Sequence, residues 1–121
     1  MKPAQHFLAL ATLAVIGGAA AQGYPNKPIR GIVPFPPGGV VDIVARTVGQ
    51  KMSEGLGQSL VIDNRGGAGG SIGTDAAAKA LADGYTVLFA FDTHAVNPHV
   101  YTTIRFDTLK DFAPVVLIVR I

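Results

Sequence analysis

Two patterns of apolar positions alternate along the chain, namely short apolar runs and apolar residues spaced three to four apart. Largely apolar runs predict three strands, at 29–35 (with Arg30 near its start), 60–62 and 85–91. The third run is apolar on both faces, which is typical of a strand in a covered parallel sheet. Apolar residues spaced three to four apart, from Val41 to Met52, predict an amphipathic helix from Val40 to about Gly55. Glycine at 55 and at 57 supplies the expected stop signals.

The second half of the chain continues this alternation. Small residues predict a tightly packed helix at Thr74–Leu81, and shorter helical turns are expected at Asn97–Tyr101 and Thr108–Phe112. Ala113–Ile121 is a fourth apolar run. Strands alternating with helices predict an α/β fold with a mostly parallel sheet flanked by helices.

Three distinctive loops follow the predicted strands, at Pro36–Asp42, Asn64–Gly73 and Asp92–Asn97. Ligands of open parallel sheets bind beyond the carboxyl ends of the strands. If the strands are neighbours, these loops meet at one edge of the sheet, and we expect a binding site there.

The first 21 residues have the pattern of a secretory signal peptide. Lys2 precedes a short apolar stretch, Phe7–Ile16, and small residues with an A-x-A site, Ala19 and Ala21, follow. The apolar stretch is too short to span a bilayer comfortably. We therefore expect cleavage after Ala21 and an exported, soluble mature chain.

The composition of the chain excludes some kinds of binding site and makes others improbable. The chain has 121 residues, which allows one domain, and no cysteine, which excludes disulfides and thiolate metal sites. The formal net charge is +2 and no cluster of lysine and arginine occurs. Neither feature suggests a nucleic-acid partner.

The turn Pro36-Pro37-Gly38-Gly39 ends a predicted strand and leads directly into the predicted helix. The first turn of a helix has free backbone N–H groups and a partial positive charge, so it can hold an anion. Asp42 has two interpretations. It can accept hydrogen bonds from a ligand amine or hydroxyl, or it can complement the helix dipole, which is worth about 0.3–1 kcal/mol.

Other chemistries are weaker. Gly69-Gly70-Ser71-Ile72-Gly73 matches the G-x-S-x-G pattern of hydrolases, but a glycine-rich loop rather than a strand precedes Ser71, so an exported serine hydrolase is the disfavoured alternative. Asp63 ends a strand as a ribose-binding acid would, yet no G-x-G-x-x-G occurs, and either a solvated strand end or an arginine partner fits it better. Asp92, His94 and His99 lack the spacing of a metal site.

Several motifs in order resemble the Bug family, the periplasmic substrate-binding proteins of tripartite tricarboxylate transporters. The matching segments are Tyr24-Pro25, Lys27–Arg30, Val33–Gly39, Asp42, Ala45-Arg46, Asp63-Asn64-Arg65, Gly67–Gly70, Ile72-Gly73, Asp83–Thr86, His94-Ala95, Asn97-Pro98 and Lys110–Val115. The resemblance covers nearly all of the expected mature chain.

The resemblance implies a type II periplasmic-binding-protein-like fold whose two lobes close around a small carboxylate, with no cofactor, no metal and no catalysis. The ligand would be a di- or tricarboxylate, an amino acid or an aromatic acid, delivered to the membrane permease subunits of the transporter. The implied substrate-binding residues are Phe35, Pro37, Gly38, Gly39, Asp42, Gly69, Gly70, Ser71, Thr93 and His94.

This chain departs from the family in two respects. It ends where a first lobe would cross into the second, so we expect residues 22–121 to be the N-terminal lobe, a fragment that binds weakly or not at all. The family often has small residues where Phe91-Asp92 stands. The carboxylate of Asp92 would repel an anionic ligand unless a cation pairs with it. It could instead favour a ligand that carries an amine, or it could point away from the cleft.

Overall fold

The computed structural model describes residues 23–120. Its elements are β1 (Ile29–Val33), α1 (Val40–Leu56), β2 (Leu60–Asn64), the 3-10 turn η1 (Ala68–Gly70), α2 (Ser71–Ala78), β3 (Thr86–Leu88) and α3 (Thr93–Val100). The expected signal peptide lies outside the described residues.

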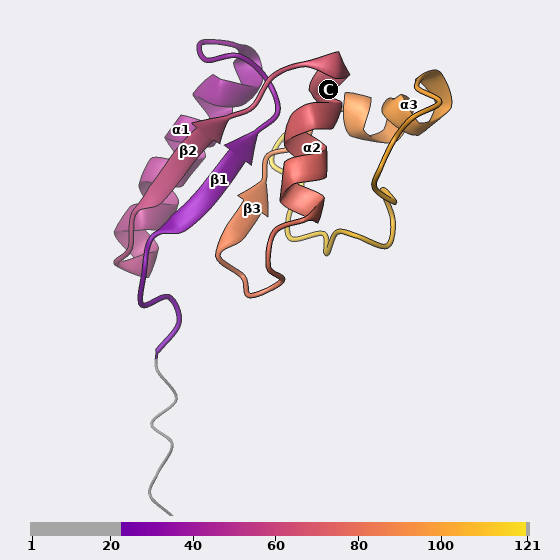
Figure 1. Cartoon of the computed structure of the whole chain (residues 1–121). Coiled ribbons are helices and arrows are strands. Elements are labelled where there is room, and N and C mark those ends of the chain that lie inside the picture. The colour runs from indigo at the N-terminus through magenta and orange to yellow at the C-terminus, as the bar shows by residue number, and fades with distance from the viewer. Residues whose placement is uncertain (1–22, 121) are drawn as a thin grey trace, which may run out of the picture.

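The three strands form one parallel sheet with the order β2-β1-β3 (Figure 1). Ile29 is opposite Leu60 in one ladder, and Gly31 is opposite Val87 in the other. The predicted α/β class, with a parallel sheet and flanking helices, is confirmed. Because β1 is central and all strands run the same way, their carboxyl ends share one edge of the sheet.

Helix α1 covers one face of β1 and β2. Val33, Ala45 and Phe89 are the buried centre of this layer, and the partly buried hydrophobic residues packed against them are Phe35, Val41, Val48, Leu60, Ile62 and Val87. Side chains alternate across a strand, so Ile32, which is fully buried, faces the opposite side, where α2 packs on β1 and β3. The sheet is thus covered by one helix on each face (Figure 1).

Helix α1 ends as the glycine pattern predicts. Gly57 adopts a left-handed conformation, with φ of 67°, and its N–H bonds to the carbonyl of Ser53, 3.1 Å away. Gly55, the other expected stop, lies inside the last turn of the helix. The face of α1 that is buried against the sheet includes Ala45 and Gly49. Only small residues at these positions let α1 approach the strands so closely.

Four predicted boundaries are corrected. Strand β1 stops at Val33 rather than at residue 35, because Pro34 follows, and β3 is limited to Thr86–Leu88 rather than 85–91. Helix α2 runs from Ser71 to Ala78 instead of 74–81, since three positive-φ glycines before Ser71 complete the turn early. Helix α3 begins at Thr93, so most of the third predicted loop is helical.

The segment after α3 has no regular helix or strand within the described residues. The expected helical turn at 108–112 is instead a hydrogen-bonded turn. Asp107 Oδ1 accepts from the backbone N–H groups of Leu109 and Lys110, at 2.9 and 3.0 Å. Beyond it, the apolar run Val115–Val119 is exposed. Nowhere between residues 23 and 120 is there a helix with the length and apolar character needed to cross a membrane.

Candidate functional site

The three loops that follow the strands meet at the carboxyl edge of the sheet. Asn64 Nδ2 donates to Asp42 Oδ1, 2.9 Å away, and this joins the second loop to the first. Asn97 Nδ2 donates to the carbonyl of Gly69, 2.9 Å away, and this joins the third loop to the second. The rings of Phe35 and Phe91, which directly precede the first and third loops, lie 6.2 Å apart and nearly perpendicular. The predicted convergence is confirmed.

Asp42 ends the first loop, in the first turn of α1, and is almost fully buried, with 3% of its surface exposed. Its Oδ2 accepts from Arg46 Nε and from the backbone N–H of Gly38, each at 2.9 Å. Its Oδ1 accepts from Asn64 Nδ2 at 2.9 Å. The hydrogen bonds from Arg46, Gly38 and Asn64 hold the pKa of the Asp42 carboxyl far below its usual range. The carboxylate is therefore charged and compensated by donors within the chain.

The Pro-Pro-Gly-Gly turn above Asp42 is exposed and leads into α1. Gly38 has φ of 84°, which is easily adopted only by glycine, and this conformation lets its N–H point back to Asp42. Gly39 is the residue before the helix. The N–H of Ile43 bonds back to Gly39, so the unpaired N–H groups of α1 are those of its first turn.

The glycine-rich second loop is packed against the first. A Cβ atom on Gly70 would lie 3.3 Å from the ring of Phe35 and 3.4 Å from Pro34. Ser71 begins α2, and its Oγ lies 3.2 Å from Asn97 Nδ2. Helix α2 thus opens at the same edge as α1, with its first turn close to Phe35.

Thr93 and His94 occupy the first turn of α3 rather than a loop. The His94 ring stacks on Phe106 at 6.1 Å and meets the edge of Phe112 at 5.0 Å. Burial lowers the pKa of His94, and contact with the backbone of Thr108 offsets part of that effect. The imidazole therefore packs against the segment that follows α3, and its buried Nδ1 has no hydrogen-bond partner among residues 23–120.

The ten predicted site residues thus fall into two groups. Eight of them lie at the shared edge, in the first two loops or directly before the first, namely Phe35, Pro37, Gly38, Gly39, Asp42, Gly69, Gly70 and Ser71. Thr93 follows the third strand at the start of α3, whereas the His94 ring packs among aromatic side chains of the later segment.

The alternative chemistries gain no support from these positions. Strand β2 ends at Asn64, and the residues up to Gly70 separate it from Ser71, so the strand-to-serine elbow of hydrolases is not formed. Asp63 accepts from Arg30 Nε at 2.9 Å and from Arg65 Nε at 3.0 Å, which confirms an arginine partner. Among residues 23–120, no three histidine or acidic side chains are grouped to hold a metal ion.

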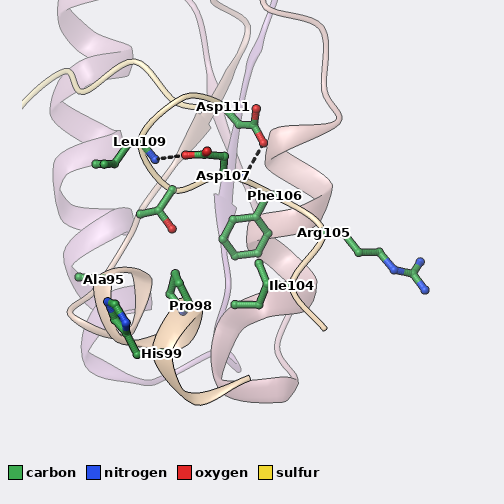
Figure 2. A pocket seen from close by; sticks show the side chains of 10 residues that line it. Ala95, Pro98, His99, Ile104, Arg105, Phe106, Asp107, Leu109 and Asp111 are labelled. Carbon is green, nitrogen blue, oxygen red and sulfur yellow. Dashed lines mark hydrogen bonds between the residues drawn. The ribbon is translucent and has the colours of Figure 1, made fainter. Parts of the chain in front are cut away.

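A separate hollow of about 660 Å³ lies between α3 and the following segment (Figure 2). Pro98, Ile104 and Phe106 supply apolar walls, while the side chain of Arg105 extends away from the others. The backbone N–H of Asp107 bonds to Asp111 Oδ2 at 2.7 Å, so these acids are used in stabilising their own turn. The hollow includes none of the ten predicted residues.

A sequence profile described as "Tripartite tricarboxylate transporter family receptor" (TctC) matches residues 44–121 of this chain. The chain belongs to the TctC receptor family. Protein BugT of Bordetella pertussis (strain Tohama I) is 43% identical over 111 residues, which are 90% of this chain and 34% of BugT. The TctC chain described here therefore spans about a third of the length of that curated relative.

Solved structures of related proteins also resemble this TctC chain. A protein described as a periplasmic transporter is 52% identical with a TM-score of 0.70, covering 73% of this chain and 30% of that one. Rpa4515 of Rhodopseudomonas palustris, solved with adipate, is 41% identical with a TM-score of 0.66, and the match covers 71% of this chain and 29% of that one. MatC of the same organism, solved with malate, is 33% identical with a TM-score of 0.69, and the match covers 75% of this chain and 31% of that one.

Sequence reasoning missed the side chains that hold the three loops together. Asn64 and Asn97 were matched as family motifs, but they were not among the ten predicted site residues. Arg46 Nη2 donates to Asn64 Oδ1 at 3.1 Å and thereby extends the network around Asp42. An asparagine at the end of a strand, or before a proline in a helix, is the signal that could have indicated such bridges.

Proposed function

We propose that this chain forms the N-terminal half of a solute-binding site that captures a small carboxylate, without chemical turnover, for a tripartite tricarboxylate transporter. The observation that carries the proposal is the meeting of three strand-end loops at one edge, where the first turns of α1 and α2 both open. Unpaired N–H groups at helix N-termini are suited to bind a carboxylate.

The charges at this edge are compatible with an anionic ligand. Asp42 is compensated by Arg46 and by two further donors, so its charge is not presented to the ligand. Asp63 is likewise paired with Arg30 and Arg65. A ligand carboxylate would therefore be bound mainly by backbone N–H groups.

The carbon skeleton of the ligand would lie against an aromatic pair. Phe35 is half-buried, and Phe91 has 38% of its surface exposed, so the two rings present apolar area beside the helix N-termini. Such area favours a ligand with several carbon atoms next to its carboxylate. Relatives solved with adipate and malate support this ligand class.

The same proposal extends to the organisation of the protein. Residues 22–121 would be the N-terminal lobe of a two-lobed binding protein, and residues 1–21 would direct export to the periplasm. The permease subunits of the transporter would be the membrane partners. The family match and the relatives, of which this chain spans about a third, support these assignments.

A titration of the ¹⁵N-labelled chain tests the proposal by NMR. Malate, adipate, citrate, aspartate and benzoate are added in turn, and backbone amide shifts are followed. We expect weak binding, in the millimolar range (about 4 kcal/mol), because one lobe supplies about half of the contacts in a closed site. The shifts should cluster at 36–42 and 69–73.

Two outcomes would contradict the proposal in different ways. If no carboxylate shifts the amides of the two loops, the binding site is absent from this chain. If a carboxylate binds with micromolar affinity, the site is already complete here, and the two-lobed account is wrong. The amide of Gly57, at the opposite end of α1, is the internal control and should not move.

A further inference from the structure

The side chain of Asn97 connects α3 to the glycine-rich loop. Asn97 is buried, with 4% of its surface exposed. Its Nδ2 donates to the carbonyl of Gly69 at 2.9 Å and lies 3.2 Å from Ser71 Oγ. One amide group therefore contacts both the last part of the loop and the first residue of α2.

The loop has a conformation that needs such support. Gly67, Gly69 and Gly70 have φ of 123°, 62° and 92°, and Ala68 between them has φ of 48°. A non-glycine residue in this region is sterically disfavoured and persists only when its surroundings hold it. Within the loop, the N–H of Gly70 bonds to the carbonyl of Gly67 at 3.0 Å. Asn97 adds the tie from a distant element.

Helix α3 also approaches the loop closely. A Cβ atom on Gly69 would lie 2.9 Å from Tyr101 Oη and 3.3 Å from Asn97 Oδ1. The backbone of Gly69 therefore packs directly against these side chains. This contact fixes the distance between α3 and the loop, and the hydrogen bonds of Asn97 fix the orientation of the loop.

We propose that Asn97 is a positioning residue, which holds the Gly67–Ser71 backbone so that the first turn of α2 faces the shared edge. Its effect on ligand binding rests on the proposed function, whereas its effect on the loop does not. Asn97 acts through Gly69 and Ser71 rather than by touching the ligand.

Amide hydrogen exchange of the full chain tests the positioning role without any ligand. In Asn97→Ala, the amides at 69–72 should exchange at least tenfold faster, because the loop opens locally. The amides of β1 should be unchanged. Val100→Ala, at an exposed position of the same helix, is the matched control and should leave the loop at wild-type rates.

A second variant separates hydrogen bonding from packing. Asn97→Asp keeps the side-chain shape but cannot donate to the carbonyl of Gly69, so it should also accelerate exchange at 69–72. Wild-type exchange there in both variants would overturn the proposal. Global loss of structure in both would overturn it too, because a role confined to the loop leaves the sheet intact.

Ligand titration separates this inference from the proposed function. If the wild-type chain binds adipate, Asn97→Asp should weaken binding by about tenfold or more. If adipate binds equally well to both proteins, the positioning role is wrong although the binding function stands. If neither binds while loop exchange still rises in the variant, the proposed function fails and the positioning of the loop stands.

Discussion

The side chain of Asn64 donates a hydrogen bond to the carboxylate of Asp42, with 2.9 Å between Asn64 Nδ2 and Asp42 Oδ1. Asn64 is the last residue of β2 and Asp42 lies in the first turn of α1, so the bond joins two elements at the edge where ligands are expected. The same nitrogen donates to the carbonyl of Phe35. Asp42 is thus the centre of a network that fixes the turn before α1.

This network should make the chain sensitive to acid. The unfolded chain takes up a proton at Asp42 near the ordinary pKa of 3.8, whereas the folded chain does so only at lower pH. Stability from Asp42 is therefore present above about pH 4 and lost as the pH falls toward the lowered folded pKa. Urea denaturation of wild type should show a falling midpoint in this range.

Asp42→Asn should reduce that dependence. Its midpoint should be lower than that of wild type at neutral pH, because the charge-assisted bond to Arg46 is lost. It should fall less on acidification, although Asp63 and Asp107, whose pKa values are also lowered, keep part of the slope. Glu54→Gln at an exposed site should behave as wild type. An unchanged slope in Asp42→Asn would show that the network does not govern acid stability.

Gly73 should tolerate no side chain. A Cβ atom there would lie 2.6 Å from the carbonyl oxygen of Arg65 and 2.7 Å from Pro34 Cα, both of which are backbone atoms. Gly73→Ala should therefore lower the free energy of unfolding by about 1–3 kcal/mol, as overpacked sites do. Urea denaturation measures this change.

Gly55→Ala is the matched control for Gly73. Gly55 lies in the last turn of α1, and no neighbouring atom in the described part of the chain would lie within 4 Å of a Cβ atom there. This variant should raise the free energy of unfolding by about 0.5–1 kcal/mol, since alanine is the better helix former. Equal effects of the two substitutions would mean that the approach of α2 to Pro34 is not tight.

The sequence was sufficient for the parts of the fold that depend on local patterns. Largely apolar runs identified β1, β2 and β3, and the spacing from Val41 to Met52 identified α1. The shared edge followed from the parallel order of the strands alone. A boundary was wrong where the backbone conformation of a turn decides it, as at Ser71, where the positive-φ glycines before it complete the turn and α2 begins early.

The candidate site was predicted less completely. A helix N-terminus and an aspartate could be read from the pattern around Gly38, but the pattern left the role of Asp42 open. Its partner Arg46 lies four positions on in the same helix, where helical spacing already places it beside Asp42, whereas Asn64, 22 positions away, is brought to Asp42 only by the fold. The packing of His94 depends in the same way on Phe106 and Phe112, which come later in the chain.

His94 should make the chain less stable at mildly acidic pH. Because burial lowers its pKa below the ordinary 6.5, the unfolded chain binds more protons just below that value. Stability is then complete above about pH 6.5 and lost as the pH falls toward the folded pKa. In wild type, the urea midpoint should decline over this range.

Two histidine variants test the assignment. His94→Leu cannot titrate, and its midpoint should be nearly constant across the same range. His99→Gln, at an exposed position of the same helix, should retain the wild-type decline. If His99→Gln removes the decline and His94→Leu does not, the aromatic surroundings of His94 are not its source.

Asp92 should set the preference between ligands. It precedes α3, it is exposed, and no described residue pairs with its carboxylate. If the proposed site is correct, Asp92→Asn should tighten adipate binding about two- to fivefold, since unit charges about 4 Å apart in water interact by roughly 1 kcal/mol. NMR titration measures the dissociation constants, and Glu54→Gln, near the other end of α1, is the equal-charge control.

For free aspartate as the ligand, we expect Asp92→Asn to have the opposite effect on affinity. Its amine can pair with the Asp92 carboxylate, so Asp92→Asn should weaken aspartate binding while it strengthens that of adipate. Added salt should reduce both changes, because charges at the surface are screened. Equal changes for the two ligands, in the same direction, would mean that Asp92 points away from the shared edge and plays no part in the choice of ligand.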